Sequence, residues 1–171
     1  MMGNIAYIDG QNLNQATTKA DIPWKVDFGR FRAYLKRKYG VDTALYFMGV
    51  HNPKYEGMYN MMRRSGFEVV FREHSKRHKS DKAGNVDSDV VFSMMRDMHE
   101  DAEPRLVLVS GDGDYIKTVR YLVDNDRMEK VLFPSHRNAS SLYKEIPTRC
   151  KAYLDDSVVR RKIELTAGGL P

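Results

Sequence analysis

Short apolar segments alternate along this chain with segments of helical periodicity, and this alternation constrains the fold more than any other feature. The apolar segments are rich in β-branched and aromatic residues and end in polar or turn residues, as strands covered on both faces do. They lie at residues 5–8, 43–47, 69–71, 106–109 and 130–133. The alternation predicts a parallel sheet with helices on both of its faces.

The helical segments fit the same arrangement. Apolar stripes at helical spacing predict helices around residues 28–35, 58–62, 90–98 and 116–123. A further strand at 152–154 and a terminal helix at 158–165 are less clearly marked. We expect a three-layer α/β/α fold with a central, mostly parallel sheet of about five strands. The 171 residues suit one domain, which we place at residues 1–165, followed by a frayed tail at 166–171.

Composition excludes several classes of protein. Hydrophobic residues make up 42% of the chain, which is enough for a core and excludes a wholly disordered protein. The single cysteine, Cys150, excludes an internal disulfide and a cysteine-rich zinc site, and fits a reducing compartment. No signal-like leader or long apolar run is present, so we expect a soluble, cytoplasmic protein without a membrane partner. The net charge of +5 suits a polyanionic partner.

Carboxylates follow two of the predicted strands directly. Asp9 follows residues 5–8, and Asp112 and Asp114 follow residues 106–109. Parallel sheets place their ligand sites at the carboxyl ends of the strands, so these side chains are expected at one edge. A single Asp there could equally cap the helix that follows. Three carboxylates from two strands favour a shared site.

The helix expected near residues 87–98 adds a fourth acid. At about 100° per residue, Asp87 points in the same direction as the apolar stripe, whereas Asp89 lies about 200° away. An acid on the inward face must cap the helix, pair with a partner or bind a cation. Whether Asp89 takes the place of Asp87 depends on where the helix begins.

Four carboxylates around one point repel one another, and a hard divalent cation relieves that repulsion. Oxygen ligands alone suit Mg²⁺ or Mn²⁺, so we expect one of these metals at Asp9, Asp87, Asp112 and Asp114. Two neighbouring side chains could support the site, since Asn12 could orient a carboxylate or water and Ser110 could hydrogen-bond near the metal. Each could instead be an ordinary turn residue.

Three motifs carry a resemblance to a known family. They are residues 8–13 (IDGQNL), 82–89 (KAGNVDSD) and 109–115 (VSGDGDY). In order and spacing they resemble the signatures of the NYN domain family, PIN-like proteins that include the LabA-type bacterial group. The resemblance covers about residues 4–135 and implies a PIN-like fold with a Mg²⁺- or Mn²⁺-dependent ribonuclease site on the same four aspartates. Many members carry a further Asp where this chain has Ser93. If that Asp supports the metal shell in those members, the resemblance implies weaker or absent activity here.

A basic loop precedes Asp87. Residues 75–82 (SKRHKSDK) carry a net charge of +3, which suits the RNA backbone beside an acidic metal site, although a solvated loop has the same composition. We expect RNA contacts from Lys76, Arg77, Lys79 and Lys82. The neighbouring His74 and His78 lack a third ligand, which disfavours a zinc site.

These observations predict a metal-dependent endoribonuclease acting on single-stranded or structured RNA, with water as the nucleophile. The alternative is a catalytically weak or inactive RNA-binding or regulatory module, which Ser93 favours. A phosphatase of the haloacid dehalogenase type ranks lower, because it needs a second acid where this chain has Gln11. The family resemblance also allows a homodimer. Trp24, Tyr55 and Tyr59 could stack on unpaired bases, but such aromatic residues more often pack in the core.

Overall fold

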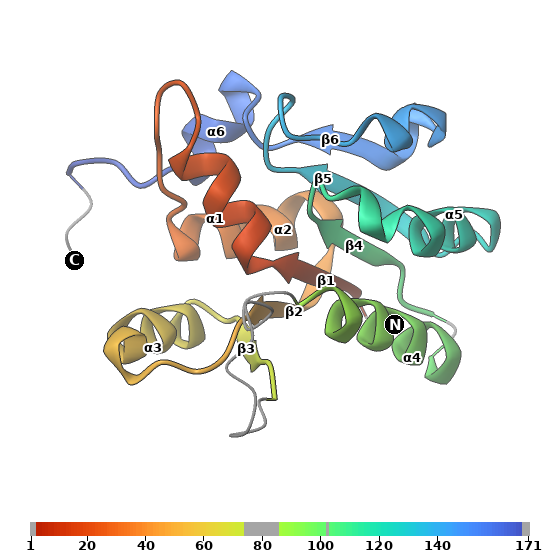
Figure 1. Cartoon of the computed structure of the whole chain (residues 1–171), viewed down its shortest axis with the longest axis horizontal. Helices are drawn as coiled ribbons and strands as arrows, with labels where there is room; N and C mark the ends of the chain where they lie inside the picture. The colour runs from red at the N-terminus through yellow and green to blue at the C-terminus, as the bar shows by residue number, and fades with distance from the viewer. Residues whose placement is uncertain (1–2, 74–85, 102, 169–171) are drawn as a thin grey trace.

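One parallel sheet organises the molecule, which is described here by a computed structural model covering residues 3–73, 86–101 and 103–168. The strand order is β3-β2-β1-β4-β5-β6, and every pairing is parallel (Figure 1). Because β2 and β3 lie on one side of β1 and the later strands on the other, the strand order reverses between β1 and β4. The strands are β1 (Asn4–Asp9), β2 (Val41–Met48), β3 (Glu68–Phe71), β4 (Leu106–Val109), β5 (Met128–Phe133) and β6 (Lys151–Tyr153).

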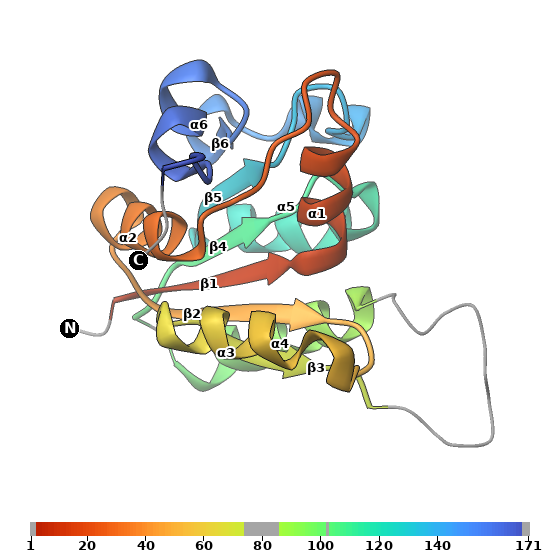
Figure 2. The same ribbon diagram turned by 90° about the vertical axis from the view of Figure 1, so that its left-hand side faces the viewer.

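Helices cover both faces of this sheet, as the alternation predicts. One face packs against α1 (Gly10–Thr18), α2 (Phe28–Tyr39), α3 (Glu56–Arg64) and α6 (Ser157–Ile163). The other packs against α4 (Asp87–Glu100) and α5 (Ile116–Asp124). The arrowheads of β1, β2, β4 and β5 point toward the same edge, where α1 begins (Figure 2). The three-layer α/β/α architecture is therefore confirmed. In the described parts of the chain, every helix is too short or too polar to span a membrane.

The central strand β1 shows why its sequence is apolar throughout. Tyr7 belongs to the core beneath α4 and α5, whereas its neighbour Ile8 belongs to the core on the opposite face. Successive side chains of a strand alternate between faces, so both kinds of position must be apolar. The same alternation directs the next residue, Asp9, toward the face that carries α4 and α5.

The sheet has one strand more than the five apolar segments predict. The added strand, β6, lies at the sheet edge and pairs with β5, in the region where the sequence marks a strand only weakly. Helix α6 ends at Ile163, before residue 165, because Glu164 forms an antiparallel bridge with Val26. The sequence pattern does not indicate helix α1, because this helix has only two buried apolar side chains, Leu13 and Ala16, which do not form an apolar stripe. Its start is stabilised by the Asp9 carboxylate, which accepts a hydrogen bond from the Asn12 backbone N–H.

Arg127 joins the carboxyl end of α4 to the loop that enters β4. Its guanidinium donates to the backbone carbonyls of Met98 (2.9 Å), Asp101 (2.6 Å) and Pro104 (2.8 and 3.1 Å). Lysine carries the same charge but lacks the planar fork that reaches three carbonyls at once.

We therefore expect Arg127→Lys to lower the free energy of unfolding by about 1–3 kcal/mol, because carbonyls lose their donors. Urea denaturation measures this change. Arg120→Lys is the matched control, since Arg120 makes an exposed ion pair with Glu145 and its loss should fall within about 0.5 kcal/mol. Equal effects of the two substitutions would contradict the structural role of Arg127.

Candidate metal centre

The carboxyl ends of β1 and β4 bring the first site residues together. The register pairs Ile8 with Val109, so Asp9 and Ser110 are the next residues of two adjacent strands. Asp9 is only 3% exposed. Its Oδ1 accepts from the Asn12 backbone N–H at 3.0 Å, and its Oδ2 lies 3.4 Å from the Ser110 hydroxyl. Asp9 thus caps α1 and also faces the other carboxylates, so the cap and site interpretations of this residue are compatible.

The loop after β4 positions Asp112 and Asp114. Asp112 Oδ1 accepts from the Asp114 backbone N–H at 3.0 Å and begins the short 3₁₀ helix η3 (Gly113–Tyr115). Ser110 Oγ accepts from the Asp112 backbone N–H at 3.1 Å, and Asn12 Oδ1 accepts from the Gly111 backbone N–H at 2.9 Å. Ser110 and Asn12 therefore fix this loop against α1 and β1.

Asp87 joins the group from α4. It is the first residue of α4, and Val86 occupies the N-cap position. One oxygen each of Asp87, Asp112 and Asp114 lie within 4.8 Å of one another. Within the described ranges, Asp89 lies outside this group of three.

Tyr115 links Asp9 to the group, and the sequence assigned it no role. This fully buried side chain places its hydroxyl 3.0 Å from Asp9 Oδ2 and 2.9 Å from Asp87 Oδ1. The hydroxyl carries one hydrogen but faces two carboxylates. Tyr115 closes the third sequence motif, but its contacts span separations of 28 and 106 residues, and only the packing of α4 against β1 brings them together.

The site is electrostatically unfavourable without a counter-charge. Burial raises the pKa of Asp9, and the nearby Asp112 adds to the rise. Burial also raises the pKa of Asp87, with further contributions from Asp112, Asp9 and Asp114, against a lowering by the Tyr115 hydrogen bond. The Tyr115 pKa is raised far above its ordinary value by burial and by the two carboxylates it contacts, so its hydroxyl keeps its proton. A close all-oxygen donor set of this charge fits a hard divalent cation such as Mg²⁺ or Mn²⁺.

The predicted RNA-contacting residues Lys76, Arg77, Lys79 and Lys82, together with His74 and His78, lie outside the described residues. The structure places other basic side chains near the site, which the sequence did not single out. Lys19 and Arg137 line a polar cavity of about 370 Å³ together with Asn12, the residue that holds the loop after β4. Arg137 also pairs with Asp21 at 2.7 Å, and both side chains are exposed.

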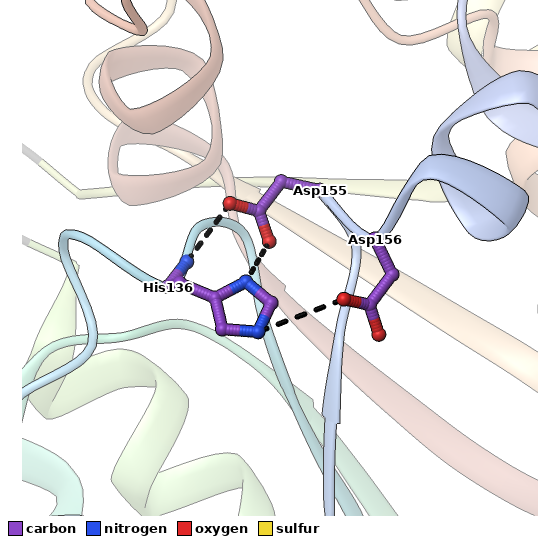
Figure 3. A group of neighbouring side chains, drawn as sticks. All are labelled: His136, Asp155 and Asp156. Carbon is purple, nitrogen blue, oxygen red and sulfur yellow. Dashed lines mark hydrogen bonds and ion pairs between the residues drawn. The ribbon is translucent and has the colours of Figure 1, made fainter.

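A second group of candidate ligands lies beside β6 (Figure 3). His136 Nδ1 is 2.7 Å from Asp155 Oδ1, and His136 Nε2 is 3.6 Å from Asp156 Oδ1. The His136 backbone N–H donates to the second Asp155 oxygen, and the imidazole stacks on Tyr153 with ring centroids 3.7 Å apart. Both ring nitrogens therefore already face carboxylates, and the group ties the end of β5 to the start of α6.

Comparisons with known proteins agree with the fold and the motifs. The sequence model of one family, the NYN domain, matches residues 5–150, a range that contains all four aspartates. The crystal structure of a protein of unknown function from Vibrio parahaemolyticus is similar, with a TM-score of 0.76 and 22% identity over 96% of this chain and 97% of that chain. At this identity the likeness shows the fold. Among curated proteins, no sequence matches the chain.

Proposed function

The chain belongs to the NYN domain family of PIN-like nucleases, and on that premise we propose that it is a metal-dependent endoribonuclease. One observation supports the proposal above the others: Asp87, Asp112 and Asp114 converge to within 4.8 Å beside the buried Asp9. We also propose that residues 1–165 act as one domain, since β6 extends the common sheet and Ile163 of α6 lies in the core.

In this proposal the four aspartates hold one or two Mg²⁺ or Mn²⁺ ions. The bound metal supplies a hydrolytic water of lowered pKa and neutralises charge on the phosphate. Asp87, Asp112 and Asp114 provide the closely spaced oxygens, and Asp9 is held in place by the Asn12 backbone and the Tyr115 hydroxyl. No side chain forms a covalent intermediate. The RNA backbone contacts basic side chains, for which Lys19 and Arg137 are candidates in addition to those predicted from the sequence.

Tyr115 acts here as a positioning residue. Tyr115→Phe keeps the buried ring but removes the hydroxyl between Asp9 and Asp87. We expect the affinity for Mn²⁺ and the cleavage rate each to fall about tenfold, as is typical when a group that orients metal ligands is removed. Calorimetric titration with Mn²⁺ measures the affinity directly, and Tyr121→Phe, at an exposed tyrosine of α5, is the control. Unchanged Mn²⁺ affinity would show that the hydroxyl has only a packing role.

The proposed function is tested by incubating a labelled, mixed-sequence RNA with the protein in Mg²⁺, in Mn²⁺ and in EDTA. Cleavage with either metal and none in EDTA is the expected result. Cleavage that persists in EDTA would contradict a metal-dependent mechanism.

A second function is favoured by Ser93, a buried residue of α4 where many family members have an Asp. In that case the protein is an RNA-binding or regulatory module whose site no longer turns over. RNA binding without product in either metal would support the module, and Ser93→Asp would then test whether the missing carboxylate accounts for the inactivity.

A further inference from the structure

A cavity of about 620 Å³ opens on the sheet face that carries α1, α2 and α3. This volume lies within the range of pockets that bind small organic ligands, about 300–1,000 Å³. Its walls include Phe28, Tyr46, Tyr55 and Tyr59, and several methionines complete the apolar lining. Tyr46 and Tyr59 belong to the core, whereas Tyr55, which also lines the cavity, is 45% exposed. A binding face of this kind offers aromatic surface to a flat ring.

Polar and basic groups accompany the apolar walls. The amide side chains of Gln11, Asn14 and Asn52 line the cavity and are exposed. Amides can both donate to and accept from the edge of a heterocycle. The Lys54 ammonium lies 5.8 Å from the centre of the Tyr55 ring, which places a positive charge beside the aromatic wall. Apolar walls, a few amides and a nearby cation suit a ligand with a flat base and an anionic backbone.

The cavity is adjacent to the carboxylate group along the chain. Gly10 and Gln11, which line it, directly follow Asp9, and Asp9 pairs with Phe47, the neighbour of the lining residue Met48. Because β1 and β2 are adjacent parallel strands, the two sites share the carboxyl end of the sheet. Strand alternation places them on opposite faces of the sheet. A ligand occupying both must therefore cross the carboxyl edge of β1 and β2.

We propose that this cavity binds one unpaired nucleobase of the RNA strand whose phosphate lies at the carboxylate group. The inference rests on the proposed function and specifies its substrate as single-stranded at that position. The base stacks on Tyr55 while an amide contacts its edge, and Lys54 faces the adjoining phosphate. Stacking on aromatic side chains tolerates any base, because every base has a π face. A paired base could not enter without leaving its stack.

The test measures RNA binding in EDTA, where turnover is not required. Short single-stranded RNAs carrying 2-aminopurine at successive positions report stacking through fluorescence quenching. We expect strong quenching at one position of the RNA. The Tyr55→Ala variant should bind these RNAs about tenfold more weakly than the wild type. Tyr55→Trp keeps an aromatic ring at this position, so it should retain both the RNA affinity and the quenching that Tyr55→Ala loses. Tyr121→Ala removes a tyrosine of similar exposure (50%) on α5, away from the cavity, and should bind as the wild type does.

Unchanged affinity and quenching in Tyr55→Ala would overturn the inference, and so would failure of the wild type to bind these RNAs. If cleavage depends on metal but RNA binding does not depend on Tyr55, the proposed nuclease function is supported and the proposed base pocket is wrong. If position-specific quenching depends on Tyr55 but neither metal supports cleavage, the base pocket is supported and the proposed nuclease function is wrong. An RNA with an abasic nucleotide at the quenched position should bind as weakly as Tyr55→Ala binds the intact strand.

Discussion

Asp112→Asn is expected to lower metal-dependent RNA cleavage by about a hundredfold or more, as loss of a preorganised electrostatic group commonly does. The substitution removes one charge from three carboxylates whose oxygens lie within 4.8 Å of one another. It leaves the local fold intact, because an amide oxygen can still accept the hydrogen bond that Asp112 Oδ1 accepts from Asp114. The substitution therefore weakens cation binding and the neutralisation of charge on the phosphate, while the loop after β4 keeps its shape.

Cleavage of the labelled RNA by both proteins, across a titration of Mg²⁺ and of Mn²⁺, measures this effect. The matched control is Asp124→Asn, which removes an exposed carboxylate at the last residue of α5 and should cut as fast as the wild type. Thermal unfolding of both variants checks that neither has lost its structure. If Asp112→Asn cleaves at the wild-type rate, the site is elsewhere.

Gly10→Ala is expected to lower the free energy of unfolding by about 1–3 kcal/mol, in the range of an overpacked core. A Cβ at Gly10 would lie 2.6 Å from the Phe47 carbonyl oxygen and 2.9 Å from both Met48 Sδ and Tyr46 Cε1. The nearest of these atoms belongs to the backbone of the central sheet, which cannot move away cheaply. In the middle of a helix, replacing Gly by Ala stabilises by about 0.5–1 kcal/mol. At Gly10, the first residue of α1, the close contacts with the sheet outweigh any such gain.

Urea denaturation of Gly10→Ala and of Gly57→Ala separates packing from helix propensity. Gly57 lies in α3, and a Cβ there would meet no atom within 4 Å, so its substitution should be neutral or stabilising. Gly10 also follows Asp9 directly, and we expect RNA cleavage by Gly10→Ala to decline as the start of α1 shifts. Equal stability changes in the two variants would contradict the close approach of α1 to β2.

Much of the fold follows from local patterns. Residues 5–8 and 106–109 are apolar throughout because both faces of β1 and β4 are buried, and this property is visible without any tertiary contact. The weakly marked elements β6 and α1 each depend on neighbouring parts of the chain. Strand β6 depends on its pairing with β5, and α1 depends on the Asp9 cap and on the packing of Leu13 and Ala16.

The sequence by itself determined which carboxylates lie at the edge of the sheet. Parallel strands end on one side, Asp9 is the last residue of β1, and Asp112 and Asp114 lie in the loop that follows β4. It also placed Asp87 on the inward face of its helix, from periodicity alone. Only the tertiary structure decided that Tyr115 joins Asp9 to Asp87, that His136 lies between Asp155 and Asp156, and that a cavity opens beside Tyr55. These arrangements depend on how segments that are far apart in the chain pack against one another, and local residue spacing does not specify that packing.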